Sequence, residues 1–392
     1  MSNVYVAGVG MTPFVKPAEG VSYIELGVAA LADALRDASI EYSAIQQVYA
    51  GYVYGDSTSG QAVVYKAGLT GVPIINVNNN CATGSTALFL ARQAIASGAA
   101  DCVLALGFEQ MAPGALGNVF EDRTSPLQSF LDIADEQMPE AAGSPMALRL
   151  FGGAGAEYQR EYGMSDAAFA KVRAKASRHA VHNPRAIFRS ELSVDDVLAS
   201  PKMVLNLTRL QCCPPSCGAA AAVLCSEDFA RARGLRTDVR IAAQAMTTDF
   251  ASSYSGSLIR AVGSEMTKEA ARQVYESAGI GPGDVNVVEL HDCFTTNEVI
   301  TYEGLGLCPV GGAERFIEDG DNTYGGRVVT NPSGGLLSKG HPLGATGIGQ
   351  CAELVWQLRG EAGPRQVEGA RIALQHNLGL GGACVVTLYQ QA

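Results

Sequence analysis

The sequence is poor in charged residues and has no long apolar run. Charged side chains make up 17% of the 392 residues and apolar ones 47%, which is typical of a globular protein with elements buried on several sides. Apolar runs such as 218–225 stay far short of the roughly 20 residues that cross a bilayer. The start, Met1-Ser2-Asn3-Val4, enters a strand-like segment without a charged leader. We therefore expect a cytoplasmic protein with no membrane span.

The cysteines and the net charge exclude two further classes. Ten cysteines lie scattered through the chain without the spacing of a disulfide framework, which suits a reducing compartment. A net charge of −11 excludes nucleic acid as a partner. The stretch 171–189 is nevertheless basic, and it is either a solvated helix face or a contact for a polyanionic ligand. Its cations are Lys171, Arg173, Lys175, Arg178, Arg185 and Arg189.

Motifs for metals and nucleotides are missing. The sequence has no P-loop, no Rossmann fingerprint after a strand and no Glu-x-x-His pattern. The run Cys212-Cys213-Pro214-Pro215-Ser216-Cys217 lacks paired Cys-x2-Cys spacing and has no histidine nearby, so we interpret it as core packing. We predict no metal and no permanently bound cofactor.

A faint internal repeat predicts the fold. The helical segment 31–39 leads through Ile40 and Ile45 to a strand at Val48, and the segment 269–278 leads through Ile280 and Val285 to a strand at Val288. These three pairs share one offset. Alternating helices and strands used twice predict a layered α/β protein made of two related halves.

Two more matches extend the repeat. Cys81-Ala-Thr-Gly84 opens the small and apolar run 85–97, and His341-Pro-Leu-Gly344 opens the similar run 345–358, each after a polar or glycine-rich turn. Each motif therefore predicts the N-terminus of a buried helix, with Pro342 in its first turn. The strand-like segments 218–224 and 382–388 close the two halves.

The repeat divides the chain. We predict a first half at 1–111 plus 201–236 and a second half at 237–392. The extra material, 112–200, predicts an inserted loop domain. Cys81 and His341 then occupy equivalent helix N-termini, and we expect them to meet across a pseudo-twofold axis.

Cys81 and His341 are candidates for nucleophilic chemistry. A helix N-terminus lowers the pKa of a thiol and favours the reactive thiolate, so Cys81 is a candidate nucleophile rather than a packed cysteine. His341 lies in the glycine-rich run 331–347, where glycines let a ligand approach the backbone. A histidine there can activate a thiol as a base.

The residues alone leave two interpretations open for each of two other motifs. His291-Asp292-Cys293-Phe294 ends a predicted strand, where sites of α/β sheets collect, but it also suits a packed cysteine beside a surface aspartate. The run 376–382 holds several glycines, which either offer N–H groups to an oxyanion or form a tight turn.

Together these motifs resemble the thiolase superfamily across essentially the whole chain. Asn78-Asn-Asn-Cys81-Ala-Thr-Gly-Ser85 resembles its nucleophile motif and Gly340-His341-Pro342 its Gly-His-Pro motif. Where better-known thiolases have Asn-Glu-Ala-Phe, this chain has His291-Asp-Cys-Phe294, and it has His376-Asn377 where they have a second cysteine. Both departures match the thiolase domain of sterol carrier protein X and its bacterial relatives. Three further segments also resemble that subgroup, Asp321-Asn-Thr-Tyr-Gly-Gly326, Asn331-Pro-Ser-Gly-Gly335 and Gln375-His-Asn-Leu-Gly379.

The resemblance implies a fold and roles. The fold is a duplicated five-layered αβαβα thiolase fold whose loop domain helps to bind CoA, assembled as a homodimer or dimer of dimers. Cys81 would be acylated and His341 would take its proton. Cys293 would be the acid and base, and His291 with His341 would polarise the thioester oxygen. Backbone N–H groups of Cys81 and Gly379 would form the oxyanion hole.

The implied function is that of an acyl-CoA acyltransferase in fatty acid and lipid metabolism. It would cleave 3-oxoacyl-CoA by thiolysis, or run the reverse Claisen condensation, with CoA and acyl-CoA as substrates. The ending Tyr389-Gln-Gln-Ala392 has no peroxisomal address, so we expect a bacterial, stand-alone enzyme. Two alternatives remain, a β-ketoacyl synthase-like condensing enzyme and a lipid-transfer or aldolase-type partner in sterol side-chain degradation. Relatives have Ser-Asp-Gly where this chain has Ser216-Cys217-Gly218, which puts one polar contact in doubt.

Overall fold

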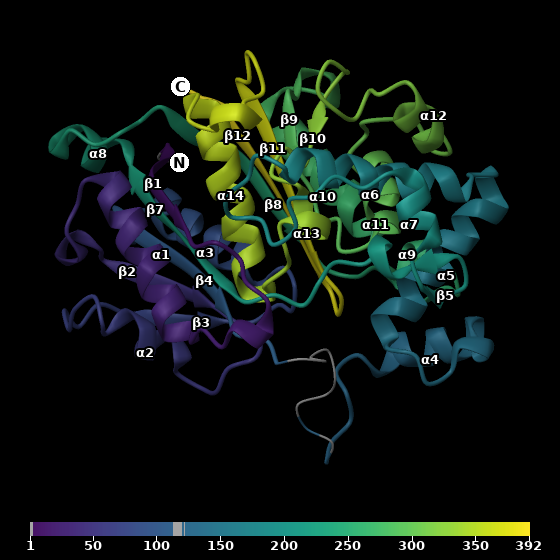
Figure 1. The fold of residues 1–392 in the computed structure, drawn as a ribbon. Coiled ribbons are helices and arrows are strands. Elements are labelled where there is room, and N and C mark those ends of the chain that lie inside the picture. Colours follow the sequence, from purple (N-terminus) through teal and green to yellow (C-terminus); the bar gives the residue numbers. More distant parts are fainter. Residues whose placement is uncertain (1–2, 113–119, 121) are drawn as a thin grey trace.

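The computed structural model describes residues 3–112, 120 and 122–392 (Figure 1). Met1 and Ser2 of the expected strand entry, and 113–119 and 121 of the expected insertion, lie outside these residues.

One continuous sheet runs through the described part of the chain, in the order β3-β2-β4-β7-β1-β8-β12-β11-β9-β10. In each half, counted from the edge of the sheet, three mutually parallel strands are followed by two strands that pair antiparallel. The pattern of parallel and antiparallel pairs is therefore the same from either edge. The halves meet where Tyr5 pairs with Arg240. The first five strands in space are β3 (Ile74–Val77), β2 (Gln47–Gly51), β4 (Cys102–Glu109), β7 (Gly218–Ser226) and β1 (Val4–Met11). The others are β8 (Val239–Thr247), β12 (Ala383–Gln391), β11 (Ile372–Gly379), β9 (Val287–Glu289) and β10 (Val329–Thr330).

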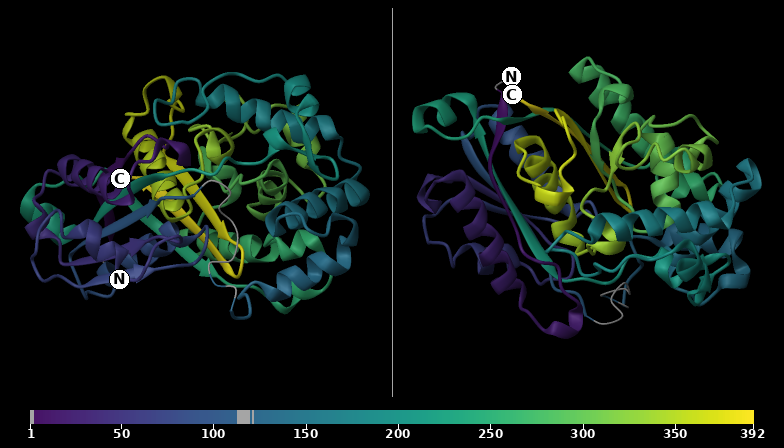
Figure 2. Two further views of the ribbon diagram at one scale, coloured as in Figure 1. Left: turned by 60° about the horizontal axis from the view of Figure 1, so that its bottom comes forward. Right: turned by 45° about the horizontal axis from the view of Figure 1, so that its top comes forward.

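Helices complete five layers, as the right-hand view of Figure 2 shows. α3 (Thr83–Ala96) and α14 (Leu343–Arg359) lie between the two halves of the sheet and share one apolar core with both. α1 (Tyr23–Ala38) covers the outer face of the first half, and α10 (Ser264–Ala278) with α11 (Thr295–Gly304) covers that of the second. The predicted duplicated α/β architecture is confirmed.

Strand β4 shows why both faces of the sheet are apolar. Leu104 and Leu106 join the core under α1, while Val103 and Ala105 join the core around α3 and α14. Because successive side chains of a strand point to opposite faces, a strand between two helix layers needs apolar residues at every position. This requirement accounts for the low content of charge.

The two central helices approach each other through glycines. A Cβ at Gly84 of α3 would lie 2.7 Å from the carbonyl oxygen of Gly344 in α14. Both helices begin at the motifs that the repeat singled out, so the seam brings the two motifs together. Pro342 is the N-cap of α14 rather than a residue of its first turn, because the helix starts at Leu343.

The inserted segment packs against the second half of the protein, although in sequence it interrupts the first half. It forms α4 (Gln128–Gln137), α5 (Met146–Tyr162), α6 (Asp166–Ala180) and α7 (Val194–Ala199), and a short hairpin of β5 (Lys202–Val204) and β6 (Leu207–Thr208) follows it in the chain. Its apolar side chains share a core with α10 and α11. Phe151 stacks on Phe294 with ring centroids 4.7 Å apart.

The solvated-face interpretation of the basic stretch is wrong for two of its cations. Arg173 and Lys175 are both only 2% exposed. Lys175 forms an ion pair with buried Glu298 of α11, and Arg173 donates to the hydroxyl of Ser338. These two side chains fasten α6 to the second half.

No helix in the described ranges is long and apolar enough to span a membrane.

Candidate active site

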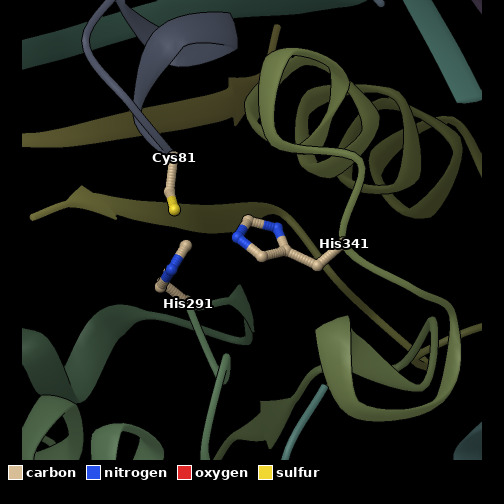
Figure 3. A group of neighbouring side chains, drawn as sticks. All are labelled: Cys81, His291 and His341. Carbon is tan, nitrogen blue, oxygen red and sulfur yellow. The ribbon is translucent and has the colours of Figure 1, made fainter. Parts of the chain in front are cut away.

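Three side chains converge at the seam between the halves. Cys81 Sγ and one ring nitrogen each of His291 and His341 all lie within 4.8 Å of one another (Figure 3). Cys81 comes from the loop before α3, His291 follows strand β9 and His341 precedes α14. The structure therefore brings together three of the four side chains expected to act in chemistry.

The loop of Cys81 is held by local hydrogen bonds. Asn80 has a left-handed φ of 50°, and its side-chain amide donates to the carbonyl of Leu380 at 3.1 Å. Thr83 accepts from the backbone of Asn79 at 2.8 Å. A Cβ at Gly379 would lie 2.9 Å from the backbone nitrogen of Ala82, so Gly379 lies directly against this loop.

The expected low pKa of Cys81 is wrong. Burial raises the pKa of the thiol to about 12, and the nearby carboxyl group of Glu109 raises it as well. Desolvation disfavours a thiolate more than the start of a helix favours it. The thiol of the free protein is therefore protonated at neutral pH.

This pKa predicts how Cys81 reacts with iodoacetamide. The alkylation rate follows the thiolate fraction, so we expect it to rise about tenfold per pH unit between pH 7 and 9. Mass spectrometry of the peptide that contains Cys81 gives the rate. A rate that is already constant at pH 7 would instead indicate a stable thiolate–imidazolium pair.

His341 presents an unprotonated nitrogen to Cys81. Its Nδ1 lies 2.7 Å from the hydroxyl of Thr346, which donates its own hydrogen to the carbonyl of Pro342 at 3.0 Å. Nδ1 must therefore donate. Burial lowers the pKa of His341 to about 3, so the ring is neutral and Nε2 has a free lone pair. Nε2 is buried without a hydrogen-bond partner, and Figure 3 shows this ring nitrogen pointing toward the other two side chains.

His291 faces His341 edge to face, with ring centroids 4.9 Å apart and an interplanar angle of 84°. Its Nδ1 lies 2.9 Å from the side-chain amide of Asn377, in strand β11. Burial, together with His341 and His376, lowers the pKa of His291 well below its ordinary value. The ring is neutral at pH 7.

Cys293 lies beside a further thiol that the sequence did not single out as functional. The backbone of Cys213 donates to the carbonyl of Cys293 at 2.9 Å, which sets the two cysteines opposite each other on paired segments. Burial raises the pKa of both thiols well above the ordinary value, and Cys81 contributes to each shift. The core-packing interpretation holds for Cys213, whose side chain packs against the core of the second half.

The alternative that Asp292 is a surface residue is wrong. Its side chain is fully buried and accepts from the backbone of Leu336 at 2.7 Å, at the start of α13 (Gly335–Ser338). Burial raises the pKa of Asp292 to about 8. The motif thus holds the glycine-rich segment before His341 in place.

The sequence analysis also did not identify Glu109 or Thr346 as residues of the site. Glu109 is 1% exposed and accepts from the backbone of Gly344, Tyr54 and Val53 at 2.9–3.1 Å, which ties the start of α14 to the first half. Its pKa rises to about 7 through burial. The one signal for Glu109 is an acidic residue at the end of an otherwise apolar strand.

His376 lies outside the group of three side chains, and its Nδ1 accepts from the backbone N–H of His291 at 3.4 Å. Its Nε2 meets the hydroxyl of Thr267 at 3.0 Å. Within the run 376–382, the residues through Gly379 belong to strand β11, and residues 380–382 form the tight turn that leads into β12. The doubt raised by Cys217 does not reach the site, because Ser216 still accepts from the backbone of His341 at 3.0 Å.

By distance alone, Cys81, His291 and His341 could bind a transition metal, since a thiolate and two imidazoles are usual ligands of zinc. The same three groups have the chemistry needed of a nucleophile, a base and a hydrogen-bond donor.

Comparison with known proteins covers both halves. Residues 4–228 match the family model of the thiolase N-terminal domain, and residues 251–389 match the model described as thiolase C-terminal domain-like. Human sterol carrier protein 2 is 56% identical over all of this chain and 72% of its own length. The benzoylsuccinyl-CoA thiolase subunit BbsB of Thauera aromatica is 37% identical over 97% of this chain and 95% of its own.

A third relative and two solved structures are also similar to this chain. The acetyl-CoA acetyltransferase of Methanothermobacter thermautotrophicus is 36% identical over the full length of both chains. An Ltp2–ChsH2(DUF35) aldolase superposes with a TM-score of 0.84 at 24% identity, over 100% of this chain and 98% of that one. Human mitochondrial 3-ketoacyl-CoA thiolase superposes with a TM-score of 0.75 at 18% identity, over 100% and 99%. These two likenesses concern the fold.

Proposed function

The chain belongs to the thiolase family, and on that premise we propose that it cleaves 3-oxoacyl-CoA by thiolysis, or runs the reverse Claisen condensation, through an acyl group on Cys81. The observation that carries the proposal is the convergence of Cys81 with one nitrogen each of His291 and His341 within 4.8 Å. In this proposal the three side chains act on the substrate directly. The reaction belongs to fatty acid and lipid metabolism.

Thiolysis begins at Cys81. As Sγ attacks the 3-keto carbon, Nε2 of His341 takes the thiol proton, and the keto oxygen becomes an oxyanion. Because thiol and imidazole are both neutral at rest, proton transfer accompanies the attack. The backbone N–H groups of Cys81 and Gly379 donate to the oxyanion, which the close packing of Gly379 on this loop supports.

Cleavage of the Cα–Cβ bond then leaves the enolate of acetyl-CoA and an acyl group on Cys81. His291 and the now protonated His341 donate to the enolate oxygen. The thiol of Cys293 protonates Cα and becomes a thiolate. That thiolate takes the proton of incoming CoA, whose sulfur attacks the acyl group, and Cys81 leaves and regains its proton from His341.

We also propose that the insertion at 112–200 binds CoA. Helix α5 supports this role, because Phe151 stacks on Phe294 immediately after Cys293. The first half at 1–111 plus 201–236 and the second at 237–392 would supply the chemistry.

We propose a cytoplasmic homodimer or dimer of dimers. All ten cysteines are free, which suits a reducing compartment. Strand β3 is at one end of the sheet and exposes 38% of Ile75, and open strand edges favour pairing with another chain. A sedimentation-equilibrium mass equal to one chain of 40.8 kDa would reject the dimer.

The proposed reaction is tested with a series of 3-oxoacyl-CoAs of increasing chain length, with and without CoA. We expect loss of substrate only when CoA is present, with acetyl-CoA and a shortened acyl-CoA as products. An aldolase would instead cleave a 3-hydroxyacyl-CoA without CoA, and a condensing enzyme would require a carrier-protein substrate. No CoA-dependent cleavage at any chain length would reject thiolysis.

A further inference from the structure

The ring of His291 stands at the end of a chain of buried hydrogen bonds that begins at a backbone carbonyl. The side-chain nitrogen of Gln375 lies 2.7 Å from the carbonyl oxygen of Gly347 and 2.7 Å from the hydroxyl of Ser85. That hydroxyl lies 2.9 Å from Asn377 Oδ1, and Asn377 Nδ2 lies 2.9 Å from His291 Nδ1. The side chains of this chain are at most 2% exposed.

The first of these bonds fixes the direction of all the others. A backbone carbonyl only accepts, so the nitrogen of the Gln375 amide faces Gly347 and gives its second hydrogen to Ser85. The hydroxyl of Ser85 has one hydrogen, which goes to Asn377 Oδ1. The nitrogen of Asn377 then faces His291, and Nδ1 of the ring accepts.

Two neighbours support this assignment. The hydroxyl of Tyr389 donates to Gln375 Oε1 at 2.5 Å, which is possible only when the oxygen of that amide points away from Gly347. The ring of His291 is neutral and has one proton, because burial and two nearby histidines lower its pKa. With Nδ1 accepting, that proton is on Nε2.

The two histidines of the site therefore have opposite tautomers. Thr346 keeps the proton of His341 on Nδ1 and leaves Nε2 as a base. Asn377 keeps Nδ1 of His291 free of a proton and leaves Nε2–H as a donor. One ring suits proton abstraction and the other suits stabilisation of negative charge.

We propose that the Gln375–Ser85–Asn377 chain fixes the proton of His291 on Nε2, so that His291 donates to the thioester oxygen as it becomes an enolate. Asn377 is thus a positioning residue that acts through His291. A proton on Nδ1 would instead turn a lone pair toward the enolate oxygen. The inference rests on the proposed function, because it assigns a donor to the enolate of that reaction.

The packing of the two central helices makes the hydrogen-bond chain possible. A Cβ at Gly347 would lie 2.6 Å from Asn377 Oδ1 and would overlap the hydroxyl of Ser85. Only glycine lets α14 approach α3 and β11 closely enough for these bonds. The fold thus builds this chain from both halves.

The first test replaces Asn377 by aspartate, which has nearly the same shape but only accepts. The titratable neighbours of His291 are His341, His376 and Cys81. In Asn377→Asp a neutral His291 donates from Nδ1 to the carboxylate and loses Nε2–H. We expect exchange of the α-protons of acetyl-CoA with solvent to fall on the order of 10²- to 10³-fold, the usual effect of one lost oxyanion donor.

The pH profile separates this effect from general damage. As the pH falls, the ring in Asn377→Asp takes up a second proton, which restores Nε2–H, so exchange should recover with a new ionisation that the wild type lacks. Acetylation of Cys81, which forms no enolate, should stay within a few-fold of wild type. The matched control is Asn76→Asp on strand β3. Oδ1 of Asn76 accepts from the backbone of Gly60 at 3.0 Å, far from His291 in the sheet order, so we expect this variant to keep the wild-type pH profile. A wild-type rate and profile in Asn377→Asp would overturn the proposal.

The second test needs neither turnover nor a folded Asn377→Asp variant. In protein labelled with ¹⁵N-histidine, we expect a protonated Nε2 and an unprotonated Nδ1 for His291, and the reverse for His341. The signals of His291 are those lost in His291→Asn. A protonated Nδ1 on His291 overturns the proposal even if Asn377→Asp does not fold. The expected tautomers without any acetylation of Cys81 would reject the proposed function and leave this assignment standing.

Discussion

Replacing Cys81 by alanine is expected to remove both the covalent intermediate and the activity. Wild-type protein incubated with acetyl-CoA and then denatured should have the mass of one added acetyl group, located by proteolysis on the peptide that contains Cys81. In Cys81→Ala that mass should disappear, and thiolysis should fall by a factor on the order of 10⁵ to 10⁶, as for loss of other catalytic nucleophiles. Among the described residues, Cys81 supplies the sulfur that lies within 4.8 Å of a ring nitrogen of both His291 and His341.

The control is Cys212→Ser, which alters a half-buried thiol in the neighbouring segment whose Sγ lies 3.4 Å from the carbonyl of Thr208. This variant should keep both the acetyl label and the turnover. Thiolysis that survives in Cys81→Ala, or a label on another cysteine, would contradict an acyl-Cys81 intermediate.

Replacing Cys293 by alanine is expected to separate the two stages of the reaction. Acetylation of Cys81 needs only His341 and the oxyanion donors, so it should persist. Protonation or deprotonation of Cα needs the second thiol, so α-proton exchange and turnover should fall on the order of 10²- to 10⁴-fold, the usual contribution of a general acid or base. Rapid-quench acetylation and α-proton exchange measured on one preparation show the split.

Cys213→Ala provides the matched control, because Cys213 lies opposite Cys293 and has a similarly raised pKa. We expect it to keep its turnover. If Cys213→Ala loses α-proton exchange and Cys293→Ala keeps it, the acid and base is Cys213. Equal loss of acetylation and exchange in Cys293→Ala would assign that residue a structural role.

The duplicated fold was predictable because its signals are local. The offset that relates Ile40, Ile45 and Val48 to their partners reflects α1 leading into β2 and α10 leading into β9. The helices after Cys81 and His341 begin within two residues of these motifs. Spacing of this kind depends only on helix and strand periodicity, so it survives even where residue identity does not.

The buried polar groups were not predictable, because their partners are far away in sequence. From the sequence, Lys175 looks like a solvated cation until Glu298 is placed beside it, and Asp292 looks like a surface residue until the first turn of α13 is placed against it. The prediction of a low pKa for Cys81 was wrong for the same reason. The sequence shows the start of a helix, whereas the desolvation that outweighs it comes from the packed neighbourhood.

The seam between α3 and α14 also bears on how the protein is made. Domains fold in the order in which they leave the ribosome, N-terminal segments first. Cys81 emerges early, whereas His341 and Asn377 belong to the last part of the chain. In the proposed mechanism, a nascent chain therefore has the thiol before it has the base and the donor that act with it. On the proposed function we therefore expect no acyl transfer from acyl-CoA until the segment that contains His341 and Asn377 has been made and folded.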